Sequence, residues 1–268
     1  MKKVSLLFIV TMIAGIVIGQ DAQPSKQSDK NSKKEARRQK VNTLIRQAEE
    51  GQLVYSNQSI FGIQLRTNGY GGFYEFGKMR TPRKTTIYRI DINETKSQKE
   101  EKLPNGGVFF GNPFIYGKIN HFYPVTLGIG QQYILGQKGN KNGVAVSAIY
   151  TAGVALGLLR PYYLQVRTMT GNDTTIKYTQ SDSLLFLGPN IIGGGGFGKG
   201  WSEIKVRPGG FVKAALRFDY GRFNEVVSGI EAGVSLEFYA QKIQIMLYQK
   251  DKRLFFQGYI SLDFGRRK

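Results

Sequence analysis

Ten charged side chains occupy alternating positions within segments where apolar and polar residues alternate. Successive side chains of a strand point to opposite faces, so these charges share one face and their large apolar neighbours share the other. The set contains four cations, Arg66, Arg89, Lys213 and Arg217, and six anions, Glu75, Asp91, Asp219, Glu231, Glu237 and Asp263. Buried charges are normally compensated by partners, so the set predicts a structural network of ion pairs. The alternatives are a narrow ion path or a buried acid–base site, because perturbed carboxylates cluster at active sites.

Groups suited to nucleophilic catalysis are scarce. The chain has no cysteine, which excludes thiolate catalysis, disulfides and thiolate metal sites. The single histidine, His121, has no serine near it in the sequence, and no Gly-x-Ser-x-Gly elbow occurs. We therefore interpret His121 as a rim residue, and we predict no catalytic residue, no metal site and no cofactor. A His–Ser pair assembled from distant strands, as in a lipid-modifying enzyme, stays open as an alternative.

The glycine-rich run at 193–200 superficially resembles a phosphate-binding loop. It lacks the Gly-Lys-Ser/Thr ending and the strand-to-helix context of such loops, so the sequence favours a flexible loop. Trp201, which follows the run, belongs either to an outer contact surface or to the aromatic belt at the level of lipid headgroups.

Eight segments show the two-residue period that would position these side chains. In 143–158, for example, large apolar residues alternate with small ones. The other segments are 59–66, 74–77 (reached through an Asn68-Gly69 turn), 84–93, 123–133, 211–220, 230–238 and 254–264. Single-chain bacterial barrels have even strand numbers and short periplasmic turns. We therefore predict an all-β fold, an eight-stranded antiparallel transmembrane β-barrel over residues 59–268.

The connections between these segments differ in length in the way that such a barrel requires. The short ones, 80–83, 136–142 and 222–227, would be periplasmic, and the long ones, 94–120, 159–210 and 240–251, would be outer loops. Within 159–210, residues 162–168 and 175–187 look like strands. They form either a hairpin that projects from the barrel or two more barrel strands. The polar run 167–182 offers no lipid-facing band, which favours eight strands over ten.

The N-terminal 51 residues are of a different kind. Lys2 and Lys3 precede the apolar run 4–18, which is typical of a secretion signal over 1–19 cleaved near Gly19/Gln20. Residues 20–31 are polar and predict a disordered linker. Residues 32–51 predict a periplasmic amphipathic helix with an apolar stripe at Val41, Leu44, Ile45 and Ala48. This helix either packs under the barrel mouth or docks a partner.

The formal net charge of +19 would suggest nucleic acid in a soluble protein. In an exported barrel the nearer anions are the phosphates of outer-membrane lipids, including lipopolysaccharide, so we expect no nucleic-acid partner. Two basic clusters, one at Arg80, Arg83 and Lys84 and one at 266–268, are expected on the periplasmic rim. They contact either phospholipid headgroups or an acidic periplasmic protein.

Three segments, 59–65, 139–150 and 258–268, together with the signal and the basic helix, resemble small outer-membrane β-barrel proteins of Bacteroidota. The resemblance spans nearly all of the chain after the signal. It implies the fold and the outer-membrane compartment, and no catalytic or ligand motif comes with it. The chain departs from outer-membrane barrels in general because four residues follow Phe264, where an aromatic residue usually ends the chain.

The sequence thus predicts a non-enzymatic integral outer-membrane barrel with periplasmic termini. Its expected role is structural, or that of an accessory subunit of an envelope complex for secretion or assembly, with periplasmic or outer-membrane proteins as partners. The alternatives are a lipid-modifying outer-membrane enzyme, a small pore or surface receptor, and a soluble periplasmic β-sandwich.

Overall fold

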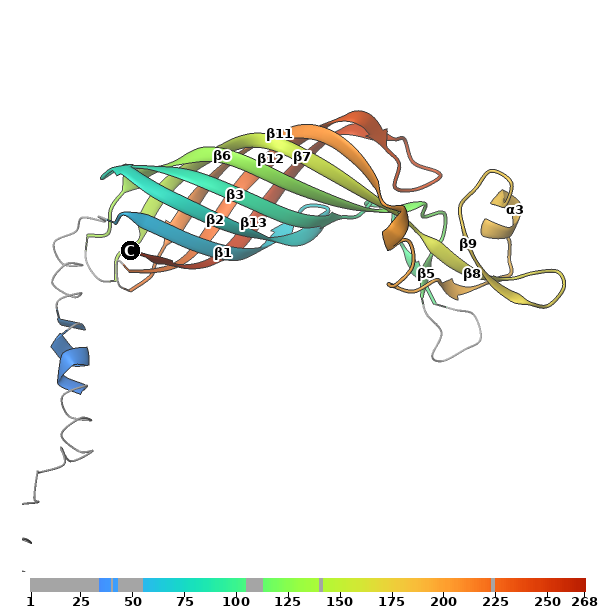
Figure 1. Ribbon diagram of the computed structural model, residues 1–268, viewed down its shortest axis with the longest axis horizontal. Coiled ribbons are helices and arrows are strands. Elements are labelled where there is room, and N and C mark those ends of the chain that lie inside the picture. Colours follow the sequence, from blue (N-terminus) through green and yellow to red (C-terminus); the bar gives the residue numbers. More distant parts are fainter. Residues whose placement is uncertain (1–33, 40, 43–54, 105–112, 140–141, 223–224) are drawn as a thin grey trace, which may run out of the picture. The chain divides into compact units, whose positions relative to one another are not determined.

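The computed structural model describes residues 34–39, 41–42, 55–104, 113–139, 142–222 and 225–268. Eight antiparallel strands close into a barrel in the order β1-β13-β12-β11-β7-β6-β3-β2, and β1 pairs with β2 to complete the ring (Figure 1). The strands are β1 (Asn57–Arg66), β2 (Gly69–Thr81), β3 (Lys84–Thr95), β6 (Asn120–Gly136), β7 (Ala145–Pro161), β11 (Lys205–Asp219), β12 (Val226–Ile243) and β13 (Lys252–Arg267). The predicted eight-stranded barrel is confirmed. Among the described residues, no helix has the length and apolar character needed to cross a membrane.

The barrel is apolar outside and polar inside, the reverse of a soluble β-protein. In β1, Phe61, Ile63 and Leu65 are exposed by 58–68%, while Gln64 and Arg66 between and after them are buried. Along the middle of the other barrel strands the same parity holds: the exposed positions carry mainly large apolar residues, and the charged residues face in. The two-residue period of a strand therefore separates a lipid-compatible exterior from a charged lumen.

Small residues let neighbouring strands approach closely. A Cβ on Gly130 of β6 would lie 2.0 Å from the Tyr150 carbonyl oxygen, and one on Gly153 of β7 would lie 2.1 Å from that of Leu127. These two strands could not keep their spacing with larger residues at these positions, which explains the small residues that alternate with large ones in this part of the sequence.

The strand-like segments between β7 and β11 do not enter the barrel. Strands β8 (Tyr163–Arg167), β9 (Asp173–Lys177) and β10 (Ile191–Gly194) form a separate three-stranded sheet in the order β10-β8-β9, with the short helices α3 (Ser183–Phe186) and η1 (Trp201–Glu203) nearby (Figure 1). A two-stranded sheet of β4 (Lys102–Leu103) and β5 (Phe114–Ile115) accompanies them. The ten-stranded alternative is therefore wrong, and a projecting hairpin forms from β8 and β9. The second strand-like segment, predicted over 175–187, is wrong in its bounds, because the strand ends at Lys177 and α3 follows within the segment.

Several predicted boundaries are wrong. The connection predicted over 159–210 is shorter, because β7 runs on to Pro161 and β11 begins at Lys205, which pairs with Leu159. The residues before Phe211 are charged or glycine-rich and show no apolar alternation, so only pairing with β7 makes them a strand. The first turn lies at Thr67 and Asn68, and Gly69 already belongs to β2. The glycine run 193–200 is not wholly a loop, since Gly193 and Gly194 are part of β10 and pair with β8.

Residues 34–39 and 41–42 are helical, within the helix predicted over 32–51. The rest of that segment lies outside the described residues, as do the predicted signal over 1–19 and linker over 20–31. Of the predicted apolar stripe, Val41 is described and is 37% exposed.

Candidate functional site

The ten charged residues singled out in the sequence all lie inside the barrel. Each is at most 8% exposed, and Glu75, Glu231 and Asp263 are fully buried. They come from six strands, β1, β2, β3, β11, β12 and β13. Because alternate residues of these strands point inward, residues that are far apart in sequence meet in one narrow lumen.

Arg217 of β11 is the centre of the network. Its two terminal nitrogens bind the Glu75 carboxylate at 2.8 and 2.9 Å, and Nη2 also lies 2.6 Å from Glu231 Oε2. Its Nε lies 2.7 Å from Asp263 Oδ2. A single guanidinium thus contacts three carboxylates, an arrangement that its planar fork of donors permits.

Arg89 and Lys213 balance the acids on the other side of this centre. Arg89 Nη1 binds Glu231 at 2.9 Å, and Arg89 Nε lies 3.2 Å from Asp91 Oδ1. Lys213 Nζ binds the same Asp91 oxygen at 2.9 Å. The Tyr259 hydroxyl donates a hydrogen bond of 2.6 Å to Glu231, which satisfies a further acceptor.

Two smaller groups extend the network toward the ends of the barrel. On one side Arg66 pairs with Glu237, which also accepts a hydrogen bond of 2.8 Å from the Tyr239 hydroxyl. On the other side Asp219 Oδ2 lies 2.7 Å from Arg267 Nη1, and Asp219 Oδ1 lies 3.5 Å from Lys138 Nζ.

Arg267 and Lys138 are members that sequence reasoning missed. The prediction that Arg267 lies on the basic rim is wrong, since it is 5% exposed and points inward with Asp263 and Gly265 on the same face of β13. The two-residue alternation of β13 could have placed Arg267 inside the barrel. No sequence pattern indicates the position of Lys138, because it lies in the connection after β6 and meets Asp219 only in the folded barrel. With these two, the network has six cations and six anions, whereas the ten residues identified from sequence had four and six.

An apolar layer lies beyond the network near one end of the lumen. Phe122, Phe211, Tyr239 and Phe255 form its aromatic part, with Ala155, Leu159 and Ile243 around them. The rings of Phe122 and Phe255 are 5.3 Å apart, and that of Tyr239 lies edge-on to both. The barrel interior is therefore filled by paired charges and then by packed rings.

His121 lies at the start of β6, beside a carboxylate and two rings. Its Nδ1 is 3.7 Å from Glu94 Oε1, and its ring stacks on Tyr123 and meets Tyr162 edge-on. The Tyr70 hydroxyl donates a 2.6 Å hydrogen bond to the same Glu94 carboxylate. The neighbours of His121 in the described part of the chain are thus a carboxylate and two tyrosine rings.

We use the name appendage for residues 162–204, which carry β8, β9, α3, β10 and η1. The appendage has a hydrophobic core of its own, built with residues from two other connections: Ile115, Tyr162, Leu164, Val166, Phe186 and Met246. Near this core, burial lowers the pKa of Lys118, and the Glu100 carboxylate at 2.7 Å opposes that shift. All three long connections between barrel strands thus pack together at one end of the barrel.

Arg160 joins the appendage to the barrel. Its guanidinium lies over the Trp201 ring at 4.6 Å and over the Phe197 ring at 4.8 Å, and Nη1 donates a 2.6 Å hydrogen bond to the Phe197 carbonyl. Trp201 also stacks on Tyr123 of β6, with ring centroids 5.9 Å apart. Trp201 therefore packs between the appendage and the rim of the barrel. Its position after a glycine run in the sequence did not predict this contact.

No protein-family model and no curated protein sequence matches the chain. Solved structures with a similar barrel include the attachment invasion locus protein Ail of Yersinia pestis, in complex with the heparin analogue sucrose octasulfate, at 11% identity and a TM-score of 0.40, over 80% of this chain and 100% of that one. The N-terminal β-barrel domain of Pseudomonas aeruginosa OprF has 11% identity and a TM-score of 0.35, over 79% and 98% of the two chains. Neisserial surface protein A has 10% identity and a TM-score of 0.36, over 79% and 96%.

Proposed function

We propose that this protein is an integral outer-membrane barrel with a closed lumen, which anchors the appendage as an accessory subunit of an envelope complex. The exterior of the barrel supports the membrane location. Large apolar side chains cover it, among them Phe61, Ile63, Leu65, Leu127, Ile129, Tyr150, Val154, Val212, Val234, Phe238, Phe256, Ile260 and Leu262, each 45% or more exposed. Soluble proteins rarely expose an apolar surface of this extent, whereas lipid-facing strands require one.

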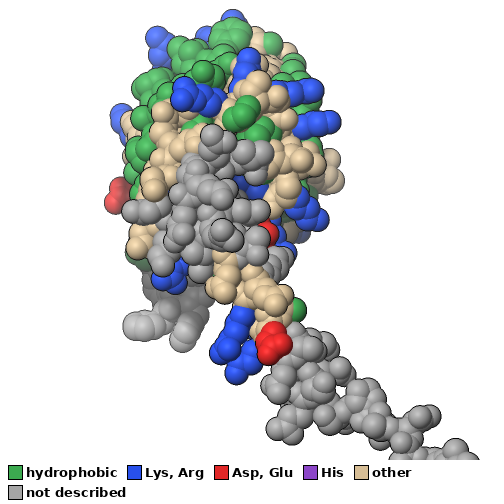
Figure 2. All heavy atoms as spheres, turned by 90° about the vertical axis from the view of Figure 1, so that its left-hand side faces the viewer, with side chains coloured by type: hydrophobic (Ala, Val, Ile, Leu, Met, Phe, Trp, Pro, Cys, Tyr) green, Lys and Arg blue, Asp and Glu red, His purple; other side chains and the backbone are tan. Residues whose placement is uncertain are grey.

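The two ends of the barrel support its orientation. The long connections and the appendage lie at one end, and the short connections lie with the C-terminus at the other (Figure 1). Lys and Arg side chains gather around the second end (Figure 2), where Arg80, Arg83, Arg222, Arg266 and Lys268 are exposed. This is the arrangement of a barrel with periplasmic termini whose basic rim contacts phospholipid headgroups. In this proposal 1–19 is a cleaved signal and 32–51 a periplasmic helix.

The lumen supports a role as an anchor in preference to a pore or an enzyme. Eight-stranded barrels have an interior only wide enough for side chains to fill, and here twelve mutually paired charges and an aromatic layer fill it. The carboxylates lie against guanidinium, ammonium or hydroxyl partners, which compensates their charge and leaves an ion path little room.

The observation that carries the proposal is the separate core of the appendage. A membrane anchor needs no folded structure outside the bilayer, yet three connections build one here. Its surface also exposes apolar side chains, with Met169, Leu184 and Phe197 exposed by 95%, 88% and 73%. Ordered apolar side chains outside the lipid-facing belt are typical of a surface that binds another protein.

The test is a mild-detergent purification of the tagged protein from outer membranes, with mass spectrometry of the proteins that accompany it. We expect a stoichiometric set of envelope proteins with the native chain, and loss of that set with Met169→Ser/Leu184→Ser. Val226→Ser, which removes an exposed apolar side chain at the opposite end of the barrel, is the matched control. A native chain that purifies alone, or a set that survives the double substitution, contradicts the proposal.

A further inference from the structure

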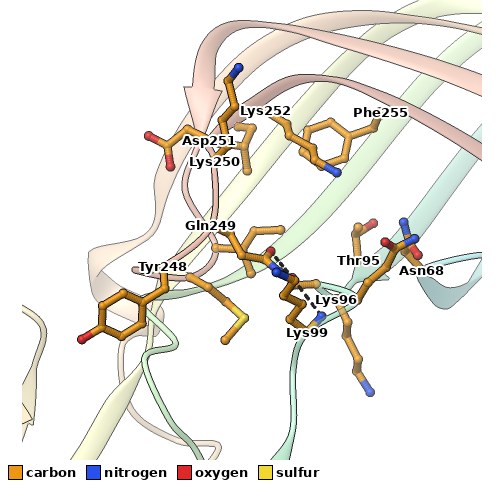
Figure 3. Close-up of a pocket in the computed structure, with 15 residues that line it drawn as sticks. Asn68, Thr95, Lys96, Lys99, Tyr248, Gln249, Lys250, Asp251, Lys252 and Phe255 are labelled. Atoms are coloured by element: carbon orange, nitrogen blue, oxygen red, sulfur yellow. Dashed lines mark hydrogen bonds between the residues drawn. The ribbon is translucent and has the colours of Figure 1, made fainter. Parts of the chain in front are cut away.

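A pocket lies at the outer end of the barrel, between the segment after β3 and the connection between β12 and β13 (Figure 3). Residues 96–99 form one wall and residues 248–252 the other, while Ile243 and Phe255 are buried at its base. The pocket volume is about 290 Å³. This is close to the lower limit of small-molecule sites, which is roughly 300 Å³, so the pocket suits a ligand of about one sugar ring.

The pocket is strongly cationic. Lys96, Lys99, Lys250 and Lys252 all line it. Lys96 lies over the Tyr70 ring at 4.9 Å, whereas the other three ammonium groups have no ion-pair partner within the described part of the chain. Lysines that surround a concave site and are not neutralised attract anions and raise their local concentration.

Nearby acidic groups offset only part of this charge. Asp251 is the acidic residue among the described lining residues, and its carboxylate points away from Lys96 and Lys99 (Figure 3). Glu94, beside Thr95, interacts electrostatically with Lys96, and Glu100 is bound to Lys118 at 2.7 Å. The remaining charge of the pocket is therefore that of Lys99, Lys250 and Lys252.

Hydrogen bonds hold the two walls in place. The Ser97 hydroxyl bonds the Gln249 side chain across the pocket (Figure 3), and Lys96 N donates to the Asn68 carbonyl at 2.7 Å. Leu247 N donates to the Gly117 carbonyl at 2.8 Å, which fixes the second wall to the connection before β6. A site whose walls are already ordered loses less conformational entropy when a ligand binds.

The pocket also offers neutral polar groups. Asn68, Gln98 and Gln249 provide amide donors and acceptors, whereas the Tyr248 ring points away from Lys96 and Lys99 (Figure 3) and lies near Gly117. Amides suit the hydroxyl groups of a sugar. An inorganic anion would use the lysines and leave the amides unused.

We propose that this pocket binds a soluble phosphorylated or sulfated saccharide, with the anionic group bound by lysines of the two walls and the sugar hydroxyl groups by the amides of Gln98 and Gln249. The base of the pocket consists of inward-facing residues of β12 and β13, so it opens above the lumen and not on the lipid-facing exterior. For this reason we assign a soluble ligand and not the headgroup of a membrane lipid. That the ligand comes from outside the cell rests on the proposed function, but its binding in detergent solution does not.

The test is calorimetric titration of the full-length protein in detergent with glucose 6-phosphate, and in parallel with glucose and inorganic phosphate. We expect saturable binding of glucose 6-phosphate that weakens as salt is added, weaker binding of phosphate, and no binding of glucose. Lys99→Gln/Lys250→Gln/Lys252→Gln should weaken glucose 6-phosphate binding by about tenfold or more, because the ionic contacts are lost. The matched control, Lys102→Gln/Lys199→Gln/Lys205→Gln, removes three exposed outer lysines that do not line the pocket and should bind as the native chain does.

Gln98→Ala separates the saccharide part of the site from its anionic part. It should weaken glucose 6-phosphate binding and leave phosphate binding unchanged. If it changes neither, and phosphate binds as tightly as the sugar phosphate, the site takes a bare anion and the saccharide assignment is wrong. Equal loss in the two lysine triples, or no saturable binding by the native chain, overturns the site itself. Displacement of glucose 6-phosphate by lipopolysaccharide in nanodiscs would instead identify a lipid-borne phosphate as the ligand. An unchanged thermal unfolding curve for each variant excludes a folding defect.

Discussion

Among single residues, Arg217 shows how the lumen depends on cations that serve several acids at once. It contacts Glu75, Glu231 and Asp263, and all four side chains are almost completely buried. Removing one partner of a buried ion pair leaves a charge without compensation, which costs about 3–5 kcal/mol. The carboxylates around Arg217 also repel one another, and its guanidinium separates them.

We expect Arg217→Gln to reduce the free energy of unfolding by about 3–5 kcal/mol, measured by urea titration of the barrel refolded into lipid vesicles. The double variant Arg217→Gln/Glu75→Gln removes one charge of each sign and should recover part of the loss. Lys205→Gln, an exposed cation of the same strand, should change stability by less than about 0.5 kcal/mol. If Arg217→Gln reduces the free energy of unfolding as little as Lys205→Gln does, the network does not stabilise the barrel.

Glu203 in η1 gives the appendage a dependence on pH. Hydrogen bonds from Lys177 and Tyr163 lower the pKa of Glu203 below its usual value of 4.5. A carboxyl group whose pKa is lowered by folding stabilises the fold above its unfolded pKa, and that stabilisation is lost as the pH falls through the folded pKa. The contact between η1 and β9 should therefore weaken only in acid, below about pH 4.5.

Trp201, the only tryptophan of the chain, lies two residues from Glu203 and reports on this contact. We expect its fluorescence to change as the pH is lowered through a midpoint below 4.5, because protonated Glu203 no longer attracts Lys177. Glu203→Gln should abolish the transition, whereas Asp173→Asn, at the distant ion pair with Arg167, should leave it in place. A transition that persists in Glu203→Gln would mean that another group titrates.

At the scale of elements, the cost of a substitution on a barrel strand should depend on which face the residue occupies and on how deep in the bilayer it lies. Ile129 lies near the middle of β6 and Leu135 near its end, and both point outward with 61% exposure. If the strands cross a bilayer, a charge at the first position faces hydrocarbon, while one at the second reaches the interface. The same substitution should thus have different costs at two positions of one strand.

We expect Ile129→Lys to destabilise the refolded barrel by about 2–4 kcal/mol and Leu135→Lys by at most about 1 kcal/mol. The measurement is reversible unfolding in lipid vesicles. Equal costs at the two depths would contradict a membrane-spanning β6. As a control, we expect the two substitutions to reduce the free energy of unfolding by equal and small amounts in detergent, because a micelle imposes no bilayer thickness.

At the scale of the whole molecule, the described lumen is packed, with a network of six cations and six anions and an aromatic layer at one end. We expect no discrete conductance steps when the purified protein is inserted into planar bilayers. A porin reconstituted in the same bilayers is the positive control. Regular openings by the native chain would show that the network rearranges, and would favour the pore over the anchor.

The sequence by itself determined the barrel, the number of its strands and the inward set of charges. The reason is that a strand repeats every two residues, so alternation assigns each residue such as Arg89 or Ile90 to a face without any knowledge of its neighbours. Where alternation fails, the prediction fails too. Lys205–Gly210 belongs to β11 only because β7 pairs with it, and Gly193 is part of a strand only because β8 lies beside it.

Only the tertiary structure decided which charges meet, what neutralises them and what the outer connections build. Lys138 reaches Asp219 across 81 residues, Arg66 reaches Glu237 across 171, and Met246 joins Leu164 in one core. Such partners depend on strand order and register, which arise from closure of the whole sheet. The two-residue period is a local property and the sequence displays it, whereas these contacts are set by closure and do not exist until the barrel has formed.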